Sequence, residues 1–188
     1  MKINTNKIRN YIIQAAHYSG HGHIPSALSI VEIITAVHNL KQKEDIFVLS
    51  KGHGCLAYYS LLVQMGHITI NELRNFGKKG SKLGGHPDRN KIKNIYASTG
   101  SLGHGFPISV GSALAKKIKG EKGKVICLIG DGEANEGSVW ESLRYIKESN
   151  LDNIEVYVNI NGYAAYDKVD VKYLEDRLKV FLPTINIR

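Results

Sequence analysis

The chain has few of the residues and patterns that mark secreted, zinc-scaffold or membrane proteins. Its 188 residues include only two cysteines, Cys55 and Cys127, which lie in separate apolar runs and lack the spacing of a zinc site. We therefore expect both to be buried free thiols. No stretch approaches the roughly 20 apolar residues of a membrane span, and the first residues lack the apolar core of a signal peptide. These absences predict a cytoplasmic protein without a membrane segment.

Other recurring patterns are also missing. The sequence has no internal repeat, no low-complexity tract and no obvious linker. No G-x-G-x-x-G pattern follows the first predicted strand, which argues against a nicotinamide-binding domain. With 43% apolar and 22% charged residues the composition is that of a globular protein, and the length suits one domain with a sizeable core. We predict a single domain over residues 1–188.

The charge balance is basic. Lysine and arginine number 25 against 17 aspartates and glutamates, which gives a net charge of +8. Such a balance invites a nucleic-acid interpretation. The lysines are scattered, however, with short clusters only at 78–79 and 116–119, and neither cluster is interleaved with aromatic residues. We therefore favour a basic surface that attracts phosphorylated substrates over a nucleic-acid site.

Hydrophobic spacing predicts strands that alternate with helices. Helices are expected over residues 8–16, 29–38, 55–65, 69–77, 106–119, 137–148 and 171–181. Strands are expected over residues 45–49, 125–129, 154–160 and 185–188. Ser29 and Glu32 have the spacing of a capping box, as do Thr69 and Glu72. The alternation predicts an α/β fold, in which ligands bind at the carboxyl ends of the strands.

One long segment fits neither helix nor strand. Residues 77–105 are rich in glycine and polar groups and have no long apolar period. Irregular chain of that length within a compact domain usually carries function. We therefore expect this segment to contribute to a binding site.

A Gly-Asp-Gly turn follows directly after the apolar strand of residues 125–129. Asn161 lies thirty residues past Asp131, at the end of the next predicted strand, 154–160. A lone Gly-Asp-Gly is a common turn, but this spacing relative to two strands is more specific. If the two strands are adjacent and parallel, both side chains reach the same edge of the sheet.

The residue types at this edge suit a magnesium ion with a diphosphate. Mg²⁺ prefers oxygen ligands and is usually held by one or two carboxylates and substrate phosphates. Asp131 would give a carboxylate oxygen, Asn161 an amide oxygen and the chain near Tyr163 a backbone carbonyl. Gly130 and Gly132 would let the backbone approach the phosphates. A helix beginning after Gly132 would direct its amino end to the same place.

The pattern resembles the metal-binding motif of thiamin-diphosphate enzymes, and further segments resemble transketolase. The segments are Leu49–His53, Leu83–Asp88, Ser98–Gly103, Gly130–Glu133 with Glu136–Gly137, and Trp140–Glu141. A stretch at 22–29 resembles another transketolase segment and places His23 in the substrate channel, although His21 offers a competing register. The resemblance implies a three-layer fold of helices, parallel sheet and helices that binds thiamin diphosphate.

Residue roles follow from this resemblance by position. The implied metal ligands, for Mg²⁺ or Ca²⁺, are Asp131, Asn161 and Tyr163. The implied cofactor-binding residues are His53, Gly100, Ser101, Leu102, Gly130, Asp131, Gly132, Glu133 and Asn161. The implied catalytic residues are His86 and His23, which would face the sugar, and Glu136, which would join a carboxylate network between subunits.

The resemblance also implies a partner. In this family a glutamate on a separate pyrimidine-binding domain activates the cofactor, and this chain has no such domain and is shorter than the family after Asn161. We therefore expect one subunit of a split transketolase in carbohydrate metabolism, which moves a two-carbon ketol unit between sugar phosphates. The partner chain would carry the pyrimidine-binding and C-terminal domains, in a heterotetramer or a dimer of such pairs.

Other interpretations stay open. The chain could instead be a shortened relative in a specialised pathway, or the product of a degraded gene. It could also belong to a 1-deoxyxylulose-5-phosphate synthase-like enzyme, or be a non-catalytic relative that kept the fold.

Overall fold

The computed structural model describes residues 3–164 and 167–188, and the chain divides into two compact units. Unit 1 comprises Met1–Lys41 and Gly52–Gly100, and unit 2 comprises Gln42–Lys51 and Ser101–Arg188. The helices of unit 1 are α1 (Thr5–Ser19), α2 (Ile24–Leu28), α3 (Val31–Leu40), the 3-10 turn η1 (Gly52–Gly54), α4 (Cys55–Gln64) and α5 (Ile70–Arg74).

Helix α4 forms the core of unit 1. Nine of its ten residues are buried, and α1, α2, α3 and α5 all contact it. A helix that is apolar on every side belongs in the centre of a helical cluster. Helix α1 packs its buried stripe of Ile8, Ile12 and Ala15 toward this core and ends at Gly20, whose φ of 74° is the left-handed conformation that glycine favours.

One predicted capping box is confirmed and the other is wrong. The Thr69 side chain accepts from the Glu72 N–H, and the Glu72 side chain accepts from the Thr69 N–H, which starts α5. Ser29 instead ends α2 in a right-handed helical conformation, and its hydroxyl donates to the Ser26 carbonyl. Helix α3 therefore begins after Ile30, without a side-chain cap. Ser29 is the C-cap of α2, so it is not available as the N-cap of α3.

Unit 2 is built on a parallel sheet. Its strands run in the order β1-β2-β3-β6, and each neighbouring pair is parallel. The elements of the unit are β1 (Ile46–Leu49), α6 (Gly105–Lys119), β2 (Val125–Gly130), the 3-10 turn η2 (Glu133–Asn135), α7 (Gly137–Glu148), β3 (Ile154–Asn159), β4 (Tyr163–Ala164), β5 (Asp167–Lys168), α8 (Val171–Phe181) and β6 (Asn186–Ile187). The predicted α/β class with a parallel sheet is confirmed.

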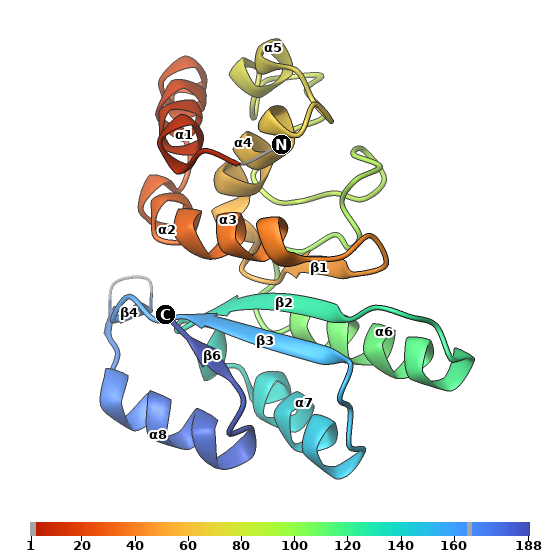
Figure 1. The fold of residues 1–188 in the computed structure, drawn as a ribbon. Helices are drawn as coiled ribbons and strands as arrows, with labels where there is room; N and C mark the ends of the chain where they lie inside the picture. Colours follow the sequence, from red (N-terminus) through yellow and green to blue (C-terminus); the bar gives the residue numbers. More distant parts are fainter. Residues whose placement is uncertain (1–2, 165–166) are drawn as a thin grey trace. The chain divides into compact units, whose positions relative to one another are not determined.

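Strand β2 lies inside the sheet, and all six of its residues are buried. Its apolar side chains on both faces explain the unbroken apolar run, which is typical of interior parallel strands. Helix α6 packs on β1, β2 and β3, and α7 contacts both α6 and α8. The three helices lie along one face of the sheet in Figure 1. In register, Gly130 at the end of β2 pairs with Asn159 at the end of β3, so both strands end together.

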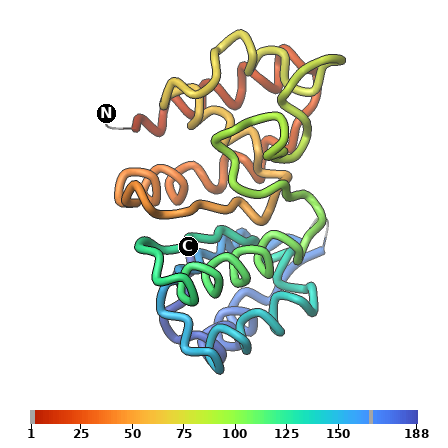
Figure 2. The backbone as a smooth tube through the Cα atoms, turned by 90° about the vertical axis from the view of Figure 1, so that its right-hand side faces the viewer, coloured from red at the N-terminus to blue at the C-terminus, as the bar shows by residue number. Residues whose placement is uncertain are grey.

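The segment predicted to be irregular contains no regular helix or strand between Arg74 and Gly105, all within the described part of the chain (Figure 2). Cys55 and Cys127 are free and buried, as expected. Across the described residues, no helix combines the length and apolarity needed to cross a membrane.

Candidate functional site

Asp131 follows β2 and is only 3% exposed. Its Oδ2 accepts hydrogen bonds from three consecutive backbone N–H groups, those of Asn161 at 2.9 Å, Gly162 at 2.8 Å and Tyr163 at 3.2 Å. Its Oδ1 accepts from the Gly132 N–H at 3.0 Å. The turn after β3 is therefore wrapped around the Asp131 carboxylate.

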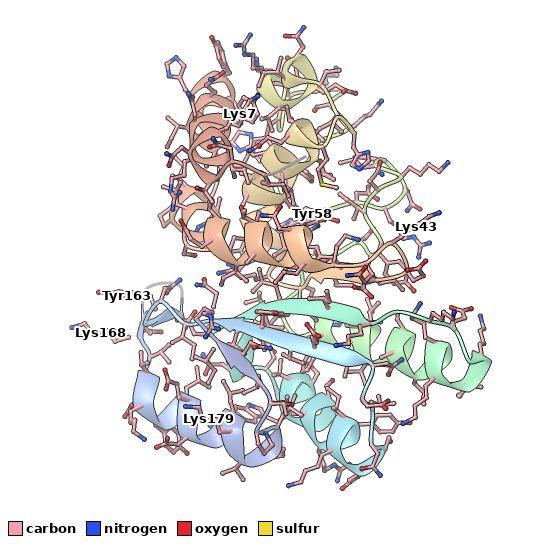
Figure 3. All side chains as sticks on the ribbon, viewed as in Figure 1. Lys7, Lys43, Tyr58, Tyr163, Lys168 and Lys179 are labelled. Carbon is pink, nitrogen blue, oxygen red and sulfur yellow. The ribbon has the colours of Figure 1, made fainter. Side chains whose placement is uncertain are left out.

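The Asn161 side chain reaches the same point. Its Oδ1 accepts from the Tyr163 N–H at 3.0 Å, and that N–H is also one of the Asp131 donors. Because both oxygens bond to one amide, they lie close together on the same side of the turn. The structure thus brings together the carboxylate and amide that the spacing of thirty residues predicted. Tyr163 is 55% exposed, and its side chain projects outward from β4 (Figure 3).

This oxygen pair suits a hard cation with additional oxygen ligands. Among the residues that the structure describes, no group of three or more His, Cys, Asp or Glu side chains could hold a metal ion. A zinc site built from nitrogen and sulfur ligands is therefore not present in that part of the chain. One carboxylate and one amide fit Mg²⁺, which completes its coordination with phosphates and water. The metal role of Asp131, Asn161 and Tyr163 stays a prediction.

Lys51 is a residue of this site that sequence reasoning missed. It follows β1, is 1% exposed, and donates from Nζ to the Asn159 Oδ1 at 2.8 Å. A Cβ atom at Gly130 would lie 3.3–3.4 Å from Lys51 Cδ, Cε and Nζ, so the lysine side chain runs across the end of β2. Burial lowers the pKa of Lys51 to about 8, while the nearby Asp131 and Glu133 carboxylates act in the opposite direction.

A second buried contact joins the residue that follows β1 to the start of η2. The Ser50 hydroxyl donates to the carboxylate of Glu133, which is 1% exposed and also accepts from the Gly103 N–H at 2.9 Å. Burial raises the pKa of Glu133, and the Ser50 hydrogen bond is the largest effect in the opposite direction. Glu133 thus links three segments of unit 2 that are distant in sequence.

The remaining predicted residues of unit 2 are more open. Ser101 and Glu136 are exposed, and Leu102 is half-buried. The expectation that a helix begins directly after Gly132 is corrected, because the 3-10 turn η2 intervenes and α7 begins at Gly137. Backbone N–H groups next to Asp131 therefore belong to tight turns rather than to the first turn of a long helix.

Unit 1 contains the predicted histidines. His53 lies in η1, and its ring centroid is 5.1 Å from that of His23, which caps α2 by accepting the Ser26 N–H at 3.3 Å. His86 is exposed and packs against Gly100, where a Cβ atom would lie 2.8 Å from the imidazole Cγ. Gly100 is thus required by this contact and by its φ of 150°.

The two registers proposed for the first histidine place it differently. The His21 ring packs at a tilt against Phe76, with ring centroids 5.0 Å apart, and lies against Gly77. The structure therefore brings His23 beside His53 and places His21 against the aromatic core of the unit. Local sequence could not separate the two, since both follow a glycine.

Comparison with known proteins identifies the family. The profile of "Transketolase, thiamine diphosphate binding domain" matches residues 2–183. The chain is 37% identical over 156 residues to one of the subunits of apulose-4-phosphate transketolase from Actinobacillus succinogenes, covering 78% of this chain and 56% of that protein. It is 33% identical over 191 residues to the 6-deoxy-6-sulfo-D-fructose transketolase subunit SqwG of a Clostridium species, covering 94% and 69%.

Solved structures agree with the sequence comparisons. A transketolase from Pichia stipitis superposes with a TM-score of 0.86 at 26% identity, covering 94% of this chain and 30% of that one. This chain thus spans about half of the first relative, with 56% of its length, and less than a third of the Pichia protein. The chain belongs to the transketolase family, in the part that forms its thiamine diphosphate binding domain.

Proposed function

We propose that this chain is the diphosphate-binding subunit of a split transketolase. In this proposal residues 1–188 act as one cofactor-binding domain, and a separate chain supplies the pyrimidine-binding domain. The complete enzyme transfers a two-carbon ketol unit between sugar phosphates, with thiamin diphosphate and Mg²⁺ or Ca²⁺. The observation that carries the proposal is the convergence of Asp131 and Asn161 oxygens on one backbone amide at the end of two parallel strands.

The division of the enzyme into two chains is supported by relatives that are themselves named as subunits. Two proteins that this chain resembles are named as subunits of transketolases, and the chain covers 56% and 69% of their lengths. Full-length human transketolase is 34% identical over 187 residues, but the chain covers only 30% of it. A partner chain would provide the remaining domains.

In this proposal the residues of unit 2 bind and orient the cofactor. Asp131 and Asn161 hold the metal ion that anchors the diphosphate, and the N–H groups around Asp131 keep its carboxylate oriented. When bound, thiamin diphosphate supplies the carbon that attacks the sugar carbonyl and stabilises the resulting negative charge. Glu136 is exposed just before α7, and by its position in the family it would lie at the contact between subunits.

The histidines would act on the sugar. By position in the family, His86 and His23 polarise the sugar carbonyl or move protons, and His53 contacts the diphosphate. An imidazole suits this work because it gains and loses a proton near neutral pH. The exposed positions of His86 and His23 leave them accessible to a substrate.

The test is cofactor binding by the assembled complex. The chain is co-purified with the product of a neighbouring gene that encodes a pyrimidine-type domain, and thiamin diphosphate is titrated calorimetrically in Mg²⁺. Asp131→Ala should weaken binding by more than about 100-fold, or about 2.7 kcal/mol. Asp152→Ala is the matched control, because its side chain is 87% exposed and pairs at the surface with Lys117. Unchanged binding by Asp131→Ala would defeat the metal assignment.

Catalysis is tested separately from binding. The complex is assayed for transfer of a ketol unit from a ketose phosphate to an aldose phosphate. A complex that binds the cofactor yet transfers nothing from any of these sugars would favour the non-catalytic relative. A chain that pairs with no pyrimidine-type domain would contradict the split-enzyme proposal.

A further inference from the structure

Three strand ends meet at the edge of the sheet that carries the candidate site. Strands β1, β2 and β3 are neighbours in that order and run parallel. The Ser50 and Lys51 N–H groups, just past β1, both bond to the Leu128 carbonyl of β2, at 2.9 and 3.4 Å. This fixes the point from which the Lys51 side chain starts. From there it spans β2 and reaches Asn159, the last residue of β3.

The Lys51 side chain passes close over Gly130. The φ of this glycine does not lie in the left-handed region, so its backbone conformation does not require glycine. A Cβ atom there would instead lie 3.3–3.4 Å from three successive atoms of Lys51, closer than ordinary contact distance. Gly130 therefore leaves room for the lysine side chain, and we call Lys51, Gly130 and Asn159 together the strand-end bridge.

The strand-end bridge puts a buried ammonium group within electrostatic range of two buried carboxyl groups, those of Asp131 and Glu133. Lys51, Asp131 and Glu133 are each 3% exposed or less. A buried ammonium is stable only with opposite charges and hydrogen-bond acceptors around it. An ammonium offers three donors and no acceptor, so Lys51 is suited to hold protein oxygens in place and not to ligate a metal.

We propose that Lys51 is a positioning residue for the Asp131–Asn161 pair. By holding Asn159 it fixes the start of the turn that continues through Asn161 to Tyr163, and the N–H groups of that turn surround Asp131. The bridge thus forms the oxygen pair before any cation arrives. The role of Lys51 in cofactor binding rests on the proposed function, in which Asp131 and Asn161 hold a metal ion. Its effect on the position of the turn does not depend on that proposal.

The experiment measures amide hydrogen exchange by NMR in the full 188-residue chain, without metal or cofactor. The amides observed are those that bond to Asp131, namely Gly132, Asn161, Gly162 and Tyr163. Lys51→Met removes the donor. Lys124→Met is the matched control, because Lys124 also joins β2 to β3 through Glu155 at 2.6 Å, but from an exposed position at the opposite end of β2.

Lys51→Met should accelerate exchange of these amides by about tenfold, equivalent to about 1.4 kcal/mol, while Lys124→Met leaves them unchanged. Two further variants keep the test decisive if Lys51→Met does not fold. Asn159→Ala removes the acceptor and should accelerate the same amides, whereas Asn159→Asp keeps an acceptor and should not. Unchanged exchange, or acceleration spread evenly over the whole of unit 2, would overturn the positioning role.

A second measurement links the bridge to the proposed function. In the complex with the partner chain, Lys51→Met should raise the Mg²⁺ concentration needed for half-maximal thiamin diphosphate binding by about tenfold. Faster amide exchange with an unchanged Mg²⁺ requirement would show that the strand-end bridge positions the turn but that the metal ion binds elsewhere. Unchanged amides with intact cofactor binding would reject the bridge and leave the proposed function standing.

Discussion

The hydrogen bond between Ser50 and Glu133 offers a direct test of how unit 2 is held together. Ser50 is 0% exposed and Glu133 is 1% exposed, so bulk water does not replace a lost donor. In Ser50→Ala the buried carboxylate loses its hydroxyl donor and keeps the Gly103 N–H. A hydrogen bond to a charged group contributes about 1.5–3 kcal/mol, so we expect the free energy of unfolding to fall by that amount.

For a chain of this length, the loss corresponds to a decrease of roughly 3–12 °C in Tm. The assay is thermal and urea unfolding followed by circular dichroism. Ser112→Ala is the control, because its hydroxyl is exposed on α6 and bonds to the Ile108 carbonyl of the same helix at 2.8 Å. Its effect should stay within about 0.5 kcal/mol. Equal stabilities for the two variants would refute the view that Glu133 depends on Ser50.

Two further predictions concern unit 1. Burial lowers the pKa of His38 to about 4 from 6.5, so stability present above pH 6.5 is lost as the pH falls toward 4. In His38→Gln the free energy of unfolding should fall by roughly 1–3 kcal/mol less over this pH range than in the unchanged chain. Urea unfolding at each pH measures this, and an equal fall in both proteins would contradict the prediction. The Tyr59 hydroxyl lies 2.8 Å from the His86 carbonyl and 3.1 Å from that of Gly84. Tyr59→Phe should therefore cost about 1–3 kcal/mol and speed proteolysis of the segment around His86, and an unchanged cleavage rate would count against that anchoring.

Local pattern predicted most of the secondary structure. The limits of α7 and α8, residues 137–148 and 171–181, agree with the expected helices because both have an amphipathic period and clear ends. The prediction of a capping box at Ser29 was wrong because a serine between two helices can either end the first or begin the second. Here Ser29 ends α2, and its hydroxyl donates to the Ser26 carbonyl. The spacing of Ser29 and Glu32 alone does not show that a separate short helix, α2, precedes them.

The candidate site was predicted in part. Asp131 and Asn161 were found because each follows an apolar strand, and parallel neighbours deliver such residues to one edge. Lys51 was overlooked because its hydrogen-bond partner, Asn159, is 108 residues away in the sequence. A lysine is ordinarily assigned to the surface, so composition and periodicity point away from this role.

The sequence by itself determined the alternation of strands and helices, the strand end that presents Asp131, and the family to which its motifs belong. These depend on short-range hydrophobic period and on residues close together in the chain. The tertiary structure decided the order and register of the strands, and with them the crossing of Lys51 over Gly130 to Asn159. Such contacts arise only when distant segments pair, because hydrogen bonding between strands is set by packing across the sheet and not by adjacent residues.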